Sequence, residues 1–163
     1  MDAPAVNAGT PPLQHETSPA EPFTITLDLD HDYQFDAELG LPGVAPLRVD
    51  ELPPIGQGNG PSPTRMLATS VGQCLASSAL YCLRKARIDV QSMSVSVLGE
   101  MVRNESGRLR MGRLTVDLVP VVQEADVPKM RRCLEIFEDF CVVTGAVREG
   151  LPIDVTVRPS TAE

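Results

Sequence analysis

The stretch SPTRMLATSVGQCLASSALYCLRKAR, residues 62–87, predicts a long helix over about 64–87, around which the rest of the chain must pack. Ser62 is a favourable N-cap, and Pro63 suits the first helical position. Lys85 and Arg87 lie where the helix dipole favours positive charge. Small and apolar residues recur every three to four positions, so one face should be buried. That face holds Leu67, Val71, Cys74, Ser78, Cys82 and Ala86.

Small side chains surround the cysteine in the middle of this helix. Gly72, Ala76, Ser77 and Ser78 flank Cys74. Small residues thin the apolar packing and let another group come close. The pattern therefore raises the question of what approaches Cys74.

The chain before the helix predicts short strands and a long loop. Residues 23–29, FTITLDL, alternate as a strand does, and further strands are expected near 33–39 and 47–49. The segment 50–63, DELPPIGQGNGPSP, is rich in proline and glycine, which exclude a helix or a central strand. Residues 1–22 are Pro-rich and predict a disordered tail, which leaves a single domain over 23–159.

The chain after the helix predicts a hairpin, a second main helix and a last strand. Residues 92–102 and 108–122 alternate as strands, and the apolar phase changes at Gly112, which indicates a β-bulge. A helix is expected over about 127–140, followed by a turn at 143–145, a short helical turn over 146–149 and a strand at 153–158. The order predicts an α+β fold with antiparallel sheets and two main helices.

Composition narrows the function classes. The net charge of −8 argues against nucleic-acid binding. We find no apolar run near the roughly 20 residues that span a bilayer, and no N-terminal secretory signal, so a cytoplasmic location is expected. The four cysteines form two pairs, each eight residues apart, whereas zinc ligands usually lie two to four apart. We therefore expect reduced thiols with no metal or cofactor, and we treat the equal spacing as a coincidence.

Two of the cysteines suit peroxide chemistry. Cys74 lies in mid-helix and Cys141 at the predicted end of the second helix, both on buried faces. A thiolate that attacks an O–O bond becomes a sulfenic acid, and a nearby second thiol condenses with it to a disulfide. The pattern alone leaves the alternative open, because free buried cysteines are common core residues. Cys82 and Cys133 are expected to be such core residues.

Three segments resemble the OsmC/Ohr family of thiol-dependent hydroperoxide reductases. They are DELPPIGQGNGPSPTRMLATSVGQC, KARIDVQSMSVSV and FCVVTGAVREGLPIDVTV, and the resemblance covers about 23–158. It implies an intertwined homodimer with Cys74 as the peroxidatic cysteine and Cys141 as the resolving one. It further implies an organic hydroperoxide substrate in oxidative-stress defence, and a dithiol reductant, either a lipoylated protein or a small thiol.

The chain departs from the family pattern near its first cysteine. The resemblance implies a glutamate where Thr64 stands, a hairpin arginine that residues 23–47 lack, and a proline where Val142 stands. Arg48 and Arg65 are the nearest candidates for the cation, and Glu51 for the carboxylate. Two alternatives follow: a relative without peroxidase activity that binds a small apolar ligand or does other thiol redox chemistry, and a purely structural interaction module.

Overall fold

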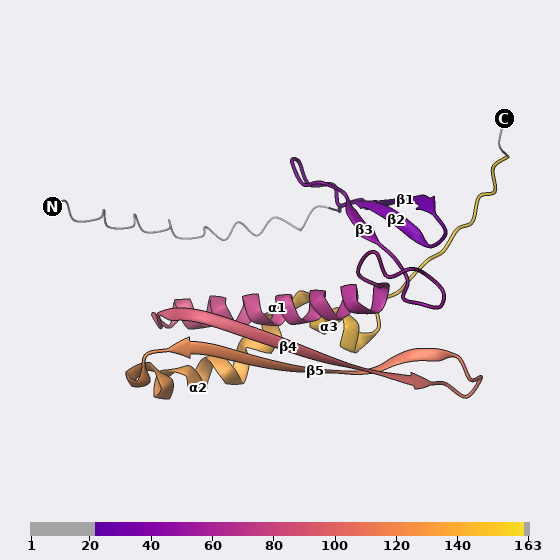
Figure 1. Ribbon diagram of the computed structural model, residues 1–163. Coiled ribbons are helices and arrows are strands. Elements are labelled where there is room, and N and C mark those ends of the chain that lie inside the picture. Colours follow the sequence, from indigo (N-terminus) through magenta and orange to yellow (C-terminus); the bar gives the residue numbers. More distant parts are fainter. Residues whose placement is uncertain (1–21, 162–163) are drawn as a thin grey trace.

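The computed structural model describes residues 22–161, which form an α+β fold with two antiparallel sheets (Figure 1). The first sheet has the order β1-β2-β3, and the second is a long hairpin of β4 and β5. The strands are β1 (Thr26–His31), β2 (Gln34–Glu38), β3 (Leu47–Val49), β4 (Val90–Arg103) and β5 (Leu109–Val122). The helices are α1 (Pro63–Lys85), α2 (Val127–Ile136) and α3 (Val142–Glu149), with the 3₁₀ helices η1 (Glu124–Asp126) and η2 (Phe137–Phe140). The predicted fold class is confirmed, while all but the last residue of the predicted tail lies outside the described residues.

The helix α1 begins and ends where its sequence signals predict. It starts at Pro63, with Ser62 at the N-cap position, and ends at Lys85. Its buried face is turned slightly from the predicted one and holds Val71, Gly72, Leu75, Ser78, Ala79 and Leu83. A Cβ atom on Gly72 would lie 2.7 Å from Cγ2 of Val97. The small residue at position 72 therefore lets β4 approach the helix.

The predicted β-bulge is present in the long hairpin. Glu100 pairs with Arg113, and the next pair is Met101 with Met111, so Gly112 is the extra residue of β5. A Cβ atom at Gly112 would lie 2.7 Å from Cγ1 of Val102, a distance that real side chains do not tolerate. The glycine thus allows the strand to shift its phase without a clash.

Two buried clusters lie along α1. The first contains Val71, Leu75, Ala79, Phe137 and Cys141, and the second contains Leu83, Ile88, Met130 and Cys133. By length and composition α1 does reach the limit for a membrane span, with a mean hydropathy of 1.3 over its best window. That is weak evidence for a span, because a helix in a protein core meets the same test, and α1 contributes side chains to both clusters.

The loop before α1 is held by one buried carboxylate. Asp50 is buried, and its Oδ2 accepts hydrogen bonds from the backbone N–H groups of Gln57 at 3.1 Å and Asn59 at 3.0 Å. Burial raises the pKa of Asp50, but backbone hydrogen bonds from Asn59, Gln57, Glu51 and Gly58 outweigh it, so the pKa lies below its ordinary value. The predicted long loop is therefore held in place by hydrogen bonds from its backbone to Asp50.

Three predictions for the C-terminal part are wrong. The second helix continues beyond Ile136 only as the 3₁₀ helix η2, and the predicted turn at 143–145 belongs to α3. Residues 153–158 form no strand: Ile153, Val155 and Val157 are 79%, 81% and 82% exposed. An alternating segment becomes a strand only where a neighbouring strand offers partners for its backbone N–H and C=O groups, and this segment has none within the described chain.

Candidate functional site

The structure brings Cys74 and Cys141 together. Cys74 lies in the middle of α1 and is half-buried, and Cys141 is the N-cap of α3 and only 3% exposed. Cys74 packs against the buried cluster that contains Cys141, and the two thiols are close enough to affect each other's pKa. Two segments that are 67 positions apart in the sequence thus present sulfur atoms to each other.

Cys141 accepts several hydrogen bonds at the start of α3. Its Sγ lies 2.9 Å from the hydroxyl oxygen of Thr144 and accepts the backbone N–H of Thr144 at 3.4 Å. Burial raises the pKa of Cys141, but hydrogen bonds from Cys74, from the Thr144 hydroxyl and from the N–H groups of Thr144 and Val143 outweigh it. The pKa of Cys141 is therefore lowered, because these donors stabilise the thiolate.

Cys74 has the opposite shift. Burial raises the pKa of its thiol first, and the hydrogen bond with Cys141 raises it further, while the backbone N–H groups of Val143 and Val142 lower it in part. The directions of the two shifts favour Cys141 over Cys74 as the thiol that ionises first. The N–H groups at the start of α3 face both sulfurs and stabilise negative charge there, as helix N-termini do.

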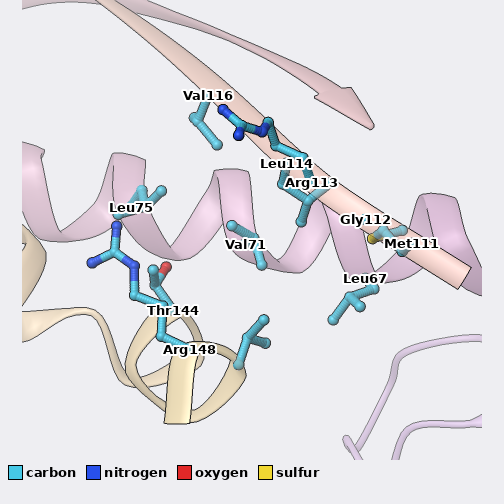
Figure 2. A pocket seen from close by; sticks show the side chains of 11 residues that line it. Leu67, Val71, Leu75, Met111, Gly112, Arg113, Leu114, Val116, Thr144 and Arg148 are labelled. Carbon is cyan, nitrogen blue, oxygen red and sulfur yellow. The ribbon is translucent and has the colours of Figure 1, made fainter. Parts of the chain in front are cut away.

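A mostly aliphatic cavity, shown in Figure 2, reaches Thr144, the neighbour of the Cys141 sulfur. It has a volume of about 380 Å³ between α1, β5 and α3. Its walls include Leu67, Val71, Leu75, Leu114, Val116, Val147 and, as the polar contributors, Arg113, Thr144 and Arg148. Thr144 is the link between the cavity and the sulfurs, since its side chain lines the cavity and its hydroxyl contacts Cys141. An apolar molecule in this cavity would lie next to the dithiol.

The four supporting residues that the sequence suggests lie away from the two sulfurs in the described chain. Arg48 donates to both carboxylate oxygens of Asp36 at 3.1 Å and also pairs with Asp30. The Thr64 hydroxyl lies 3.1 Å from that of Ser62. Glu51 is half-buried at the start of the loop.

Arg65 lines a second, more open hollow of about 540 Å³ between α1 and β4. Across residues 22–161, no hydrogen bond or ion pair joins any of these four side chains to either sulfur. Their supporting role stays a prediction.

Sequence reasoning missed Thr144 and the start of α3. The signal was present, because Thr144 stands three positions after Cys141, the spacing at which an N-cap side chain meets a backbone N–H of the first turn. Gly145 and the β-branched residues before it favoured a turn instead. In the described part of the chain, no three or more His, Cys, Asp or Glu residues gather where they would hold a metal ion.

Solved structures share this fold. An OsmC-like protein of unknown function from Vibrio cholerae aligns with a TM-score of 0.65 and 11% identity over 76% of this chain and 91% of its own. An organic hydroperoxide resistance protein OsmC from Legionella pneumophila aligns with a TM-score of 0.54 and 15% identity, over 77% and 88%. The organic hydroperoxide resistance protein OhrB of Bacillus subtilis gives 0.53 and 17%, over 78% and 90%.

A search of curated proteins finds no match. The family profile described as OsmC-like protein matches residues 56–156, which include α1, the hairpin, both cysteine pairs and α3. More than half of the chain thus carries the family's pattern, and the protein belongs to the OsmC family.

Proposed function

We propose that this protein reduces organic hydroperoxides through Cys74 and Cys141 and so takes part in oxidative-stress defence. The observation that carries the proposal is the contact of two thiols at the start of α3, next to an aliphatic cavity. Peroxide reduction by thiols needs a stabilised thiolate and a second thiol within reach, and the lowered pKa of Cys141 beside Cys74 supports this reading. Relatives named as organic hydroperoxide resistance proteins share the fold.

The exposure of the two sulfurs favours Cys74 as the attacking one. Cys74 is half-buried, whereas Cys141 is buried and carries the first thiolate. In the proposed reaction Cys141 takes the proton of Cys74 as the Cys74 sulfur attacks the terminal oxygen of the hydroperoxide. The O–O bond breaks, Cys74 becomes a sulfenic acid, and the alkoxide takes the proton back from Cys141 and leaves as the alcohol.

The second step closes the cycle within the same pair. The Cys141 thiolate attacks the sulfenic sulfur of Cys74, an S–S bond forms, and hydroxide leaves. One hydroperoxide has then accepted two electrons from two thiols. A dithiol, either a lipoylated protein or a small thiol, reduces the disulfide by exchange and restores both cysteines.

The thiolate in this scheme does not depend on a cation. Backbone N–H groups of α3 and the Thr144 hydroxyl lie against the sulfurs, whereas the family resemblance implies an arginine as the group that lowers the thiol pKa. These dipoles carry less charge than a guanidinium group. We therefore expect slower turnover than in relatives with the full set of residues.

We also propose that the protein is an obligate homodimer whose subunits intertwine. Leu151, Ile153, Val155 and Val157 are all exposed in one extended segment, and Leu27 and Leu29 of β1 are exposed as well. An alternating apolar segment without a strand partner is stable when it pairs with another chain. Sedimentation at micromolar concentration tests this, and a monomer would contradict it. A cytoplasmic location stays part of the proposal.

A second candidate function is the binding of a small apolar ligand without peroxide turnover. The observation that favours it is the cavity, whose wall is mostly aliphatic and reaches the sulfurs only through Thr144. This candidate predicts that the purified protein retains a ligand and that its thiols do not consume hydroperoxide.

Mass spectrometry after one equivalent of cumene hydroperoxide separates the two functions. The peroxidase proposal predicts a Cys74–Cys141 disulfide and release of cumyl alcohol. Cys74→Ser should abolish turnover with a dithiol donor, and Cys82→Ala, on the same helix, should leave it unchanged. If Cys74 stays a free thiol in the folded wild-type protein, the peroxidase proposal is wrong.

A further inference from the structure

A second pair of thiols meets along the same helix. Cys82 follows Cys74 by eight residues on α1, and Cys133 precedes Cys141 by eight residues in the chain that packs against α1. Because the two segments run in opposite directions, the first contact joins positions 74 and 141, and the second joins 82 and 133. The equal spacing is thus a result of helix packing and not the coincidence that the sequence suggests.

The contact between Cys82 and Cys133 is direct. The side chain of Cys82 packs against the second buried cluster, which contains Cys133, and the Cys82 thiol is close enough to affect the pKa of Cys133. Cys133 is 4% exposed, whereas Cys82 is half-buried. Burial raises the pKa of Cys133 to about 11, and the neighbouring Cys82 thiol raises it further, so the Cys133 thiol keeps its proton.

The surroundings of this pair differ from those of Cys74 and Cys141. The hydrophobic neighbours of the pair are Leu83, Ile88, Val90, Met93, Val122 and Met130, whose side chains are aliphatic or thioether. Two isolated buried cysteines would be ordinary core residues. Two neighbouring thiols can also be oxidised to a disulfide by thiol–disulfide exchange. A disulfide needs two thiols whose Cα atoms lie within about 7 Å, and the packing of both side chains in one cluster of α1 and α2 favours such an approach.

We propose that Cys82 and Cys133 form a second, independent redox-active dithiol, which small apolar disulfides oxidise to an intramolecular disulfide. In the first step the Cys82 sulfur attacks one sulfur of the reagent, a mixed disulfide forms, and one thiolate leaves with the proton of Cys82. In the second step the Cys133 sulfur attacks the Cys82 sulfur of the mixed disulfide, the Cys82–Cys133 bond forms, and the second thiolate leaves with the proton of Cys133. Two thiols are oxidised and one disulfide is reduced.

The order of attack and the class of reagent follow from the burial. Cys82 reacts first because it is the more exposed sulfur of the pair, and Cys133 acts only after a reagent is attached to its neighbour. The aliphatic surroundings favour neutral, apolar reagents over charged ones.

The two pairs act independently because eight residues of helix separate Cys74 and Cys82 by about 12 Å, whereas exchange needs sulfur contact. The new disulfide would tie α2 to α1, because Cys133 lies on α2 and Cys82 on α1.

The test uses the full-length chain with Cys74→Ser and Cys141→Ser, which removes the first pair, and 4,4′-dithiodipyridine as the probe. The proposal predicts release of two pyridinethione groups per chain and a product lighter by two hydrogen atoms, with Cys82 and Cys133 linked in the peptide map. Adding Cys133→Ala should stop the reaction at one released group and leave a stable adduct on Cys82. Adding Cys82→Ala should nearly abolish release.

The wild-type protein gives a second measurement that no substitution can disturb. After oxidation its peptide map should contain the Cys82–Cys133 link beside any product of the first pair. Stable adducts on Cys82 with Cys133 present, or links only between separate chains, would overturn the proposal. The Cys74→Ser, Cys141→Ser chain lacks both cysteines of the proposed peroxidase reaction. Its reaction with 4,4′-dithiodipyridine is therefore independent of whether the protein consumes hydroperoxides.

Discussion

The two thiol pairs of this protein have the same composition and lie on the same helix, but their surroundings differ. Cys74 and Cys141 meet backbone N–H groups of α3 and the Thr144 hydroxyl, whereas Cys82 and Cys133 pack in a cluster of aliphatic and thioether side chains. The pKa of one sulfur is lowered in the first pair, and the pKa of Cys133 is raised to about 11 in the second. The difference teaches that the donors around a thiol, and not its spacing in the sequence, decide whether it ionises.

The largest expected effect is a loss of hydroperoxide turnover, which should follow from a substitution in the first thiol pair and not from one in the second. Cys141→Ser should permit one oxidation of Cys74 and then abolish turnover, because no neighbouring thiol remains to condense with the sulfenic acid. Mass spectrometry should then find sulfinic acid on Cys74 under excess hydroperoxide. Cys133→Ser should turn over hydroperoxide at the wild-type rate per folded molecule. Equal losses in both variants would contradict the division between the pairs.

The second effect separates the pairs by stability. Leu83 is 1% exposed and packs in the cluster that holds Cys133. Leu83→Ala should lower the free energy of unfolding by about 2–5 kcal/mol, because it removes buried methyl groups and leaves a cavity. Urea unfolding measures the change, and Leu67→Ala on the more exposed part of α1 serves as a control that should cost less. A larger loss at position 67 would contradict the placement of Leu83 in the buried core and of Leu67 outside it.

A smaller effect tests the donor at Cys141. Thr144→Val keeps the shape of the side chain but removes the hydroxyl, which lies 2.9 Å from the Cys141 sulfur. A hydrogen bond to a charged group contributes about 1.5–3 kcal/mol, so the thiolate fraction at neutral pH should fall about tenfold or more. The pH dependence of iodoacetamide labelling of Cys141 in the folded protein measures the thiolate fraction. Thr144→Ser, which keeps a hydroxyl, should give the wild-type pH dependence. An unchanged profile in Thr144→Val would exclude the hydroxyl as the donor.

The smallest effect is the pH dependence of stability that arises from Cys133. Its folded pKa lies above the value in the unfolded chain, so the folded state keeps a proton that the unfolded state loses. The contribution to stability is complete below the unfolded pKa and is lost as the pH rises toward about 11. Cys133→Ala should flatten this alkaline decline in chemical denaturation. A decline of the same steepness in the variant would assign it to other groups.

Local signals in the sequence predict much of the fold. Ser62 and Pro63 mark the start of α1, and the change of apolar phase at Gly112 places the bulge, because both features depend on backbone chemistry within a few residues. The predicted strand at 153–158 is wrong because a strand depends on contacts with a distant segment. Alternation of apolar residues does not say whether a partner strand is present. Cys74 and Cys141 are brought together, but their roles stay predictions.

The contacts between distant segments are what the sequence does not reveal. The pairing of Arg48 with Asp36 depends on the register of β2 and β3, and the contact of Cys82 with Cys133 depends on how α1 and α2 pack. Neither follows from spacing along the chain. Thr144 lies between these cases, because its position after Cys141 is a local signal that becomes clear only once α3 is known to begin there.

The close approach of β4 to α1 at Gly72 has an evolutionary consequence. A Cβ atom at position 72 would lie 2.7 Å from Cγ2 of Val97, so the two positions constrain each other. A lineage that acquires alanine at 72 must first or simultaneously accept a smaller residue at 97, and Val97→Ala opens that route. Relatives should therefore show substitutions at these two positions as a covarying pair, with the total side-chain volume nearly constant.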